Sequence, residues 1–153
     1  MFRFMFLKGS CLALALYSGG SALALPYTKG NIFASVGNGK VKEFTPAGVL
    51  VQTLDTTTGS NYTTGSAFDP SGNFYVTSFG GSKVSKFDNT GTLANANFVT
   101  GNTDNESLVF DMAGNFFLGQ ADGVQKLYKY NSSGTLINSW SPTVGHEEPI
   151  GLT

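Results

Sequence analysis

Phe-Asp-Pro-Ser-Gly-Asn-Phe-Tyr-Val-Thr, from Phe68 to Thr77, is the stretch that decides the fold. Its Asp-Pro-Ser-Gly part predicts a tight turn, because Asp bonds its own backbone, Pro presets φ and Gly accepts a positive φ. The aromatic and β-branched residues that follow predict a strand. Related stretches follow Gly30 and Gly114, so the unit recurs every 42 residues. A second element repeats in the same phase, at Lys40–Phe44, Lys83–Phe87 and Lys126–Tyr130.

The middle unit predicts four antiparallel strands joined by tight turns. These strands are Ser66–Phe68, Asn73–Phe79, Lys83–Phe87 and Thr92–Val99. The first unit is the weakest copy, since it has Thr45–Gly48 in place of an acidic turn and lacks an inner strand with its own Asp. A period near 40 residues built from short strands is typical of a β-propeller blade. We therefore expect an all-β chain of about three four-stranded blades, over residues 30–65, 66–107 and 108–153.

The segments Phe68–Thr77 and Val84–Leu93 resemble the NHL repeat. The resemblance covers essentially all of Asn31–Thr153 and implies a relation to the six-bladed propellers that include the SMP-30/gluconolactonase-like and strictosidine-synthase-like groups. A WD40 propeller is disfavoured, because the single Trp, Trp140, is not part of a repeating Trp-Asp turn.

The chain holds about three of the six blades that this resemblance implies. It ends at Gly151-Leu152-Thr153, inside an expected strand. Open repeat arrays usually carry polar caps, because an unpaired strand edge invites aggregation. The pattern therefore favours a piece of a longer propeller, and the alternative is self-association, in which two chains together complete one ring.

Residues 1–24 have the pattern of a cleaved secretory signal peptide. Arg3 and Lys8 form a positive start, a short apolar segment begins at Cys11, and Ala22-Leu23-Ala24 is a small-residue cleavage site. We therefore expect a secreted, periplasmic or extracellular protein. The remaining chain contains no cysteine, so its stability must come from packing without disulfides.

The charge pattern excludes two classes of partner. The whole chain has a formal charge of −1, and removal of Arg3 and Lys8 with the signal makes it −3. Arg3 is the only arginine, and the chain has no polybasic run. Recognition of phosphate backbones and of anionic membranes depends on clustered cations. We therefore expect no nucleic-acid partner and no membrane association after signal cleavage.

One group of residues is a candidate metal site. His146-Glu147-Glu148 lies in the loop before the next expected inner strand, and its counterparts are Asn61–Gly65 and Thr103–Glu106. Such loops line the mouth of a propeller channel, so Glu106, His146 and Glu148 are candidate ligands of a divalent cation such as calcium. The alternative, a solvated acidic loop with one surface histidine, is favoured over a metal site.

The remaining candidates indicate structure rather than chemistry. Asp69, Asp88 and Asp111 are explained by turn capping. Aromatic residues at equivalent positions predict packing between neighbouring blades rather than a carbohydrate platform; these pairs are Phe68/Phe110 and Phe74/Phe116. We identify no catalytic residue.

The sequence therefore favours an exported, non-catalytic binding module that presents a loop-lined face to a protein or glycan. The alternative is part of a metal-dependent lactonase-, esterase- or lyase-like propeller enzyme.

Overall fold

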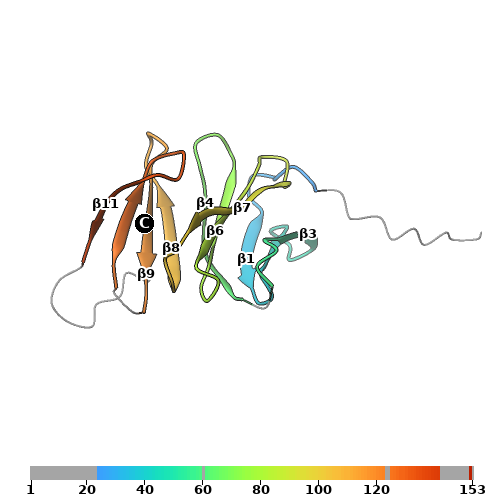
Figure 1. Cartoon of the computed structure of the whole chain (residues 1–153). Coiled ribbons are helices and arrows are strands. Elements are labelled where there is room, and N and C mark those ends of the chain that lie inside the picture. The colour runs from blue at the N-terminus through green and yellow to red at the C-terminus, as the bar shows by residue number, and fades with distance from the viewer. Residues whose placement is uncertain (1–23, 60, 123–124, 142–151, 153) are drawn as a thin grey trace, which may run out of the picture.

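The computed structural model describes residues 24–59, 61–122, 125–141 and 152, and within them eleven strands form three antiparallel sheets. The sheets stand side by side in chain order (Figure 1). The first contains β1 (Ile32–Val36), β2 (Lys40–Phe44) and β3 (Leu50–Asp55). The second contains β4 (Thr63–Phe68), β5 (Phe74–Ser78), β6 (Lys83–Phe87) and β7 (Leu93–Thr100). The third contains β8 (Asn105–Phe110), β9 (Phe116–Gln120), β10 (Leu127–Tyr130) and β11 (Leu136–Trp140).

Each sheet is one blade of a β-propeller, which confirms the predicted fold class. The second and third sheets have the consecutive orders β4-β5-β6-β7 and β8-β9-β10-β11. The first has the order β1-β2-β3, so within the described residues no inner strand precedes β1. The predicted signal peptide lies in residues outside the described part, apart from its last position, Ala24. No helix in the described part is long and apolar enough to cross a membrane.

The inner strands are longer than the sequence predicts. β4 begins at Thr63 and β8 at Asn105, so Gly65 and Glu106 lie in strands, where we expected loops. The register shifts between Thr63 and Ser66, and again between Asn105 and Ser107. Such irregularities insert extra residues without ending the strand pairing, which explains why the residue pattern indicated a loop.

The hydrophobic cores lie between the blades. In β5 all five residues are buried, and successive side chains point to opposite faces. Phe74 and Val76 therefore pack in a core with Val41 and Leu54 of the first blade. Tyr75, the residue between them, belongs to the core shared with the third blade.

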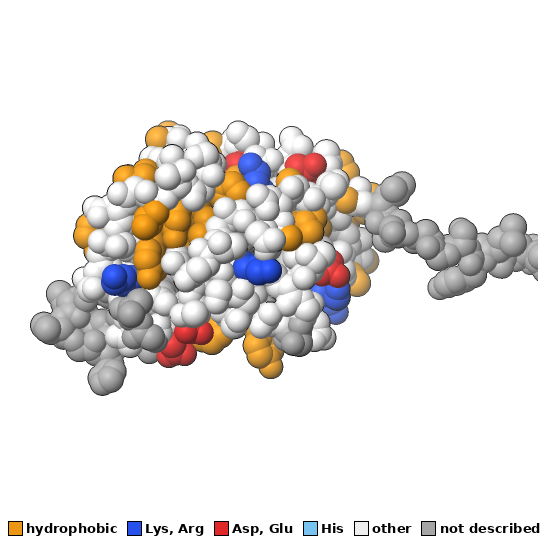
Figure 2. Space-filling view, viewed as in Figure 1, with side chains coloured by type: hydrophobic (Ala, Val, Ile, Leu, Met, Phe, Trp, Pro, Cys, Tyr) orange, Lys and Arg blue, Asp and Glu red, His pale blue; other side chains and the backbone are white. Residues whose placement is uncertain are grey.

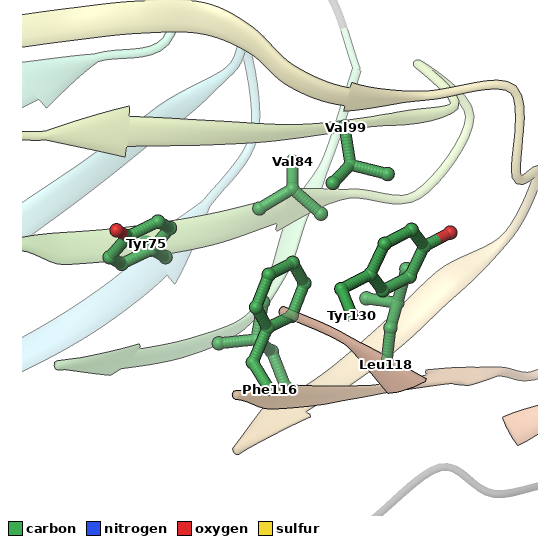
Figure 3. Close-up of a cluster of buried hydrophobic side chains, with 7 residues drawn as sticks. Tyr75, Val84, Val99, Phe116, Leu118 and Tyr130 are labelled. Carbon is green, nitrogen blue, oxygen red and sulfur yellow. The ribbon is translucent and has the colours of Figure 1, made fainter. Parts of the chain in front are cut away.

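Aromatic rings join neighbouring blades at repeat-equivalent positions, as predicted. The rings of Phe33 and Phe68 are 5.2 Å apart between centroids, and those of Tyr75 and Phe110 are 4.8 Å apart. Figure 3 shows Tyr75 and Val84 of the second blade facing Phe116 of the third. Each such aromatic pair contributes about 0.5–1.5 kcal/mol beyond the burial of its area.

The tight turns are held as predicted. Asp69 accepts hydrogen bonds through Oδ1 from the backbone N–H groups of Ser71 and Asn73 at 2.9 Å. Gly72 completes the turn with φ of +82°. Asp88, Asp111 and Asn131 make the same kind of turn.

The first blade replaces the acidic turn residue with a glutamate from a neighbouring strand. In the second blade, the Asn73 side-chain amide donates to Asp69 Oδ2 at 2.8 Å. The equivalent Asn31 donates instead to Glu43 Oε1 at 2.6 Å. Tyr27 stands 42 residues before Asp69 in the sequence, so the first blade has no Asp there. Glu43 is fully buried and supplies the missing carboxylate, which explains why the weakest copy of the repeat still folds as a blade.

Replacing Gly65 with Ala should destabilise the protein by about 1–3 kcal/mol, the usual cost of overpacking. A Cβ atom at Gly65 would lie 2.7 Å from the carbonyl oxygen of Glu106, so the inner strands β4 and β8 would have to separate. Gly37→Ala is the matched control, since its Cβ would meet only the Tyr62 ring at 3.6 Å. The measurement is denaturant unfolding of both variants. Equal midpoints for the two variants would contradict the close approach of the inner strands.

Asp88→Asn should keep its turn but reduce the acid sensitivity of the protein. Hydrogen bonds from the Thr90 hydroxyl and from the N–H groups of Thr90 and Thr92 hold the pKa of Asp88 below its ordinary value. Because the pKa of Asp88 is lower in the folded state than in the unfolded state, the ionised carboxylate stabilises the folded state at pH values above the unfolded-state pKa of ~3.9. This stability is lost as the pH falls through the folded-state pKa. The repeat-equivalent Asn131 makes the same turn without a charge.

The measurement for this second prediction is thermal unfolding from pH 6 down to pH ~2. Asp88→Asn should lose less stability than the unmodified protein across this range. Superimposable pH profiles would show that the Asp88 carboxylate contributes nothing.

Candidate functional site

The two ends of the sheets differ in regularity. At one end, which we call the turn face, tight turns join the strands; these turns are 45–49, 69–73, 88–92, 111–115 and 131–135. At the other end, which we call the loop face, the connections vary in length. Their described residues are 37–39, 56–59, 61–62, 79–82, 101–104, 121–122 and 125–126.

Unusual backbone conformations gather on the loop face. Within the described residues, five non-glycine positions have positive φ, and each of the five loops of this face contains one. They are Asn38, Thr57, Ser82, Asp104 and Gln125, with φ between 47° and 60°. Ser82 and Gln125 occupy the position in the repeat that Gly39 occupies in the first blade, and Gly39 also has a positive φ. At this position the positive φ is therefore a feature of the repeat itself. A β-branched residue such as Thr57 rarely adopts it, and such strain is concentrated at functional sites.

Side-chain amides support these loops from within. The Asn61 amide donates to the carbonyl oxygen of Thr58 at 2.7 Å. The Asn105 amide donates in the same way to the carbonyl oxygen of Asn102 at 2.8 Å. The Gln120 amide donates to the Thr103 hydroxyl at 3.1 Å. The loops are therefore held in defined conformations, which lowers the entropy cost of binding a ligand.

A buried polar layer lies directly beneath the loop face. It consists of Thr63, Thr77, Ser78, Asn105 and Gln120. The Thr63 hydroxyl accepts a hydrogen bond from the N–H of Val36 at 2.9 Å and so joins the first two blades. The Thr64 hydroxyl donates to the carbonyl oxygen of Asn105 at 2.6 Å and joins the next two. Ser78 Oγ and Asn105 Oδ1 are buried without a hydrogen-bond partner among the described residues.

The predicted metal ligands are only partly described. Glu106 lies in β8 and is half-buried, while His146 and Glu148 lie outside the described residues. Within the described residues, no group of three His, Cys, Asp or Glu side chains is placed to hold a metal ion. Glu106 stands 42 residues after Thr64, whose hydroxyl has a structural role between the inner strands. The site Glu106/His146/Glu148 therefore stays a prediction.

The most exposed aromatic side chain of the loop face is one that sequence reasoning missed. Tyr62 is 68% exposed and precedes β4. Its ring lies beside the β1–β2 loop, 3.6 Å from the position that a Cβ of Gly37 would occupy. The only feature of the sequence that could have singled out Tyr62 is its difference from Asp104, which occupies the same position in the next repeat.

Four surface cavities lie away from the loop face. Two of about 480 and 530 Å³ open along the groove between the first and second blades, at Tyr27 and at Leu25 respectively. A third, of about 190 Å³, lies on the turn face around Asp69. The fourth, of about 350 Å³, lies on the outward face of the third blade around Phe117. The side of the molecule shown in Figure 2 carries scattered charges of both signs and no extended basic patch.

Sequence comparisons identify no relative: no protein-family model matches the chain, and no curated protein matches it. Comparison with solved structures does identify its fold. The chain is similar to a protein of unknown function from Bacteroides caccae, with 20% identity and a TM-score of 0.57 over 73% of this chain and 46% of that one.

Two further structural neighbours are a lyase and a WD40 domain. Streptogramin B lyase gives 15% identity and a TM-score of 0.60, over 73% of this chain and 37% of the lyase. The WD40 β-propeller domain of Doa1 gives 16% identity and a TM-score of 0.56, over 80% of this chain and 39% of that one. The chain thus spans less than half the length of each neighbour. At these identities the similarity shows the fold, and the chain is built of β-propeller blades.

Proposed function

We propose that this protein is an exported, non-catalytic binding module of NHL type, whose loop face recognises a protein or a glycan. The observation that carries the proposal is the gathering of positive-φ residues in the five loops of one face. These conformations cost free energy, and nothing comparable occurs at non-glycine residues of the turn face.

The composition of the loop face supports recognition of a macromolecule. Its described residues are mostly Gly, Asn, Thr and Ser, with the exposed ring of Tyr62 among them. Tyr combined with small polar residues is the composition of antibody binding loops, where the rigid ring supplies area and the amides and hydroxyls supply hydrogen bonds.

The second candidate is a metal-dependent lactonase-, esterase- or lyase-like propeller. The likeness to streptogramin B lyase, at 15% identity, supports only the shared fold. This candidate requires Glu106 to act together with His146 and Glu148. The structural use of the equivalent Thr64 favours the binding module over it.

Tyr62→Ala should weaken ligand binding by about tenfold or more, since exposed tyrosines often carry much of the energy of an interface. The probes are an array of glycans and a displayed library of random peptides, both screened against the unmodified protein. The affinity of each selected ligand is then measured for the variants. Met112→Ala is the matched control, because Met112 is fully exposed but lies on the turn face.

For the control variant we expect unchanged affinity. Two results would contradict recognition by the loop face. One is equal affinity of the selected ligands for Tyr62→Ala and for the unmodified protein, and the other is a loss of affinity in Met112→Ala alone.

Glu106→Gln should leave calcium binding unchanged if the protein is a binding module, because Glu106 then holds no metal. The measurement is calorimetric titration of calcium chloride into the unmodified protein and the variant. Calcium binding that disappears in Glu106→Gln and also in Glu148→Gln would instead support the metal-dependent candidate.

A further inference from the structure

Three connections of the loop face meet at Tyr62, which belongs to the connection between β3 and β4. The Tyr62 ring lies 3.6 Å from the position of a Cβ at Gly37, in the loop between β1 and β2. The carbonyl oxygen of Tyr62 accepts a hydrogen bond from the N–H of Phe79, in the loop between β5 and β6, at 2.9 Å. The neighbouring Asn61 carbonyl accepts from the N–H of Gly39 at 2.7 Å. We call residues 37–39, 56–59, 61–62 and 79–82 the Tyr62 platform.

Polar side chains of the platform keep capacity for hydrogen bonds. The Asn61 amide donates to the carbonyl oxygen of Thr58 at 2.7 Å, and its Oδ1 atom has no partner among the described residues. Asn38 and Thr57 are exposed, and neither side chain makes a hydrogen bond within the described part of the chain. Both have positive φ, so the backbone that carries them is constrained. An amide and a hydroxyl can each donate and accept.

The platform contains no charged residue. It consists of Gly, Asn, Thr and Ser together with Tyr62 and Phe79. At its edge, Lys40 and Asp55 form an ion pair with each other. The charged residue of the next loop, Asp104, contacts the platform through its backbone N–H, which donates to the carbonyl oxygen of Phe79. Anionic groups are recognised mainly by Arg and Lys, so an anionic ligand gains no ion pair on this platform.

Exposed apolar surface on the platform is limited to one ring. Among the exposed large apolar side chains of the described residues, Tyr62 is the one that lies in these loops. A protein partner usually requires about 800 Å² on each side, with a core rich in aromatic residues, Met and Arg. A sugar ring requires less, because it has a face of C–H groups and a rim of hydroxyls that each donate and accept. One aromatic ring among amides and hydroxyls matches such a ligand.

We propose that the Tyr62 platform binds a neutral glycan, with one sugar ring stacked on Tyr62. The C–H face of the sugar lies against the face of the aromatic ring, which carries partial negative charge. Asn38, Thr57 and Asn61 bond the hydroxyls at the rim. This assignment rests on the loop face being the binding surface proposed above, and it commits that surface to a saccharide.

The test is binding to an array of neutral oligosaccharides, built of hexoses and N-acetylhexosamines, and of acidic ones that contain uronic or sialic acids. Each neutral oligosaccharide that binds is then titrated calorimetrically. We expect the neutral class alone to bind. Its affinity should change by less than about twofold between about 50 and about 500 mM NaCl, because salt screens only interactions between charges.

Three variants separate stacking from hydrogen bonding. Tyr62→Ala should lower the affinity by about tenfold or more, whereas Tyr62→Phe should keep it within about threefold, because stacking uses the ring. Asn38→Gly should lower the affinity by about fivefold, since glycine retains the positive φ and only the amide is lost. Both positions are exposed, so the variants should fold, and thermal unfolding checks this.

Saturation-transfer NMR locates the contact on the sugar. Transfer should be strongest to the C–H protons of one face of one sugar ring, and it should be lost in Tyr62→Ala. Equal affinity of the neutral glycans for Tyr62→Ala and the unmodified protein would overturn the stacking site. Binding of the acidic class alone, or an affinity that falls steeply with salt, would overturn the neutral ligand.

The peptide screen described above separates failure of this assignment from failure of the proposed function. Peptides that require Tyr62, in the absence of any neutral glycan that binds, would overturn the glycan assignment and leave the binding function standing. If no ligand of either class requires Tyr62, both are overturned.

Discussion

The contact between Phe33 and Phe68, repeated 42 residues later between Tyr75 and Phe110, is the constraint on which the structure depends. The second and third blades are single sheets of four strands and the first has three; such sheets bury little when isolated. Burial comes only when the face of one sheet meets the face of the next. The strand β5 shows this directly, because it is buried on both faces by two different neighbours.

Packing between blades also explains where the protein can vary. Four of the five turns of the turn face repeat one solution, an Asp or Asn whose side chain holds the turn while a glycine takes the positive φ, and Thr45 takes the place of the Asp in the fifth. The first blade reaches the same result with buried Glu43 when the turn Asp is replaced by Tyr27. The loop face is free of this constraint, and its loops differ in length, sequence and backbone conformation. A regular scaffold with one variable face is the arrangement that binding proteins commonly use.

Much of the fold could be predicted from the sequence, because its main signals are local. A turn such as Asp69–Gly72 has a pattern that four residues define, and the aromatic positions follow from the repeat. The extension of β4 to Thr63 could not be predicted, since it depends on the Thr63 hydroxyl, which accepts from the N–H of Val36 and donates to the carbonyl oxygen of Lys40, both more than 20 residues away. The role of Glu43 depends likewise on Asn31 in another segment.

The candidate site was less accessible to prediction than the fold. The sequence pointed to Glu106, whose residue type suits a metal; the structure places it in a strand and not in the expected loop, and the metal site itself stays a prediction. For Tyr62 the sequence offers only its difference from Asp104 in the next repeat, because the exposure of a single ring depends on the arrangement of the loops around it. The left-handed conformation of Thr57 is equally hidden, since its residue type disfavours it.

The central claim is that stability comes from contacts between blades, and hydrogen exchange of backbone amides tests it most directly. The account predicts that amides of β5, covered on both faces, exchange most slowly, and that those of β11, at the edge of the third blade, exchange fastest among the strands. Protection that is equal in β5 and β11 would show that each blade is stable by itself, and would contradict the account.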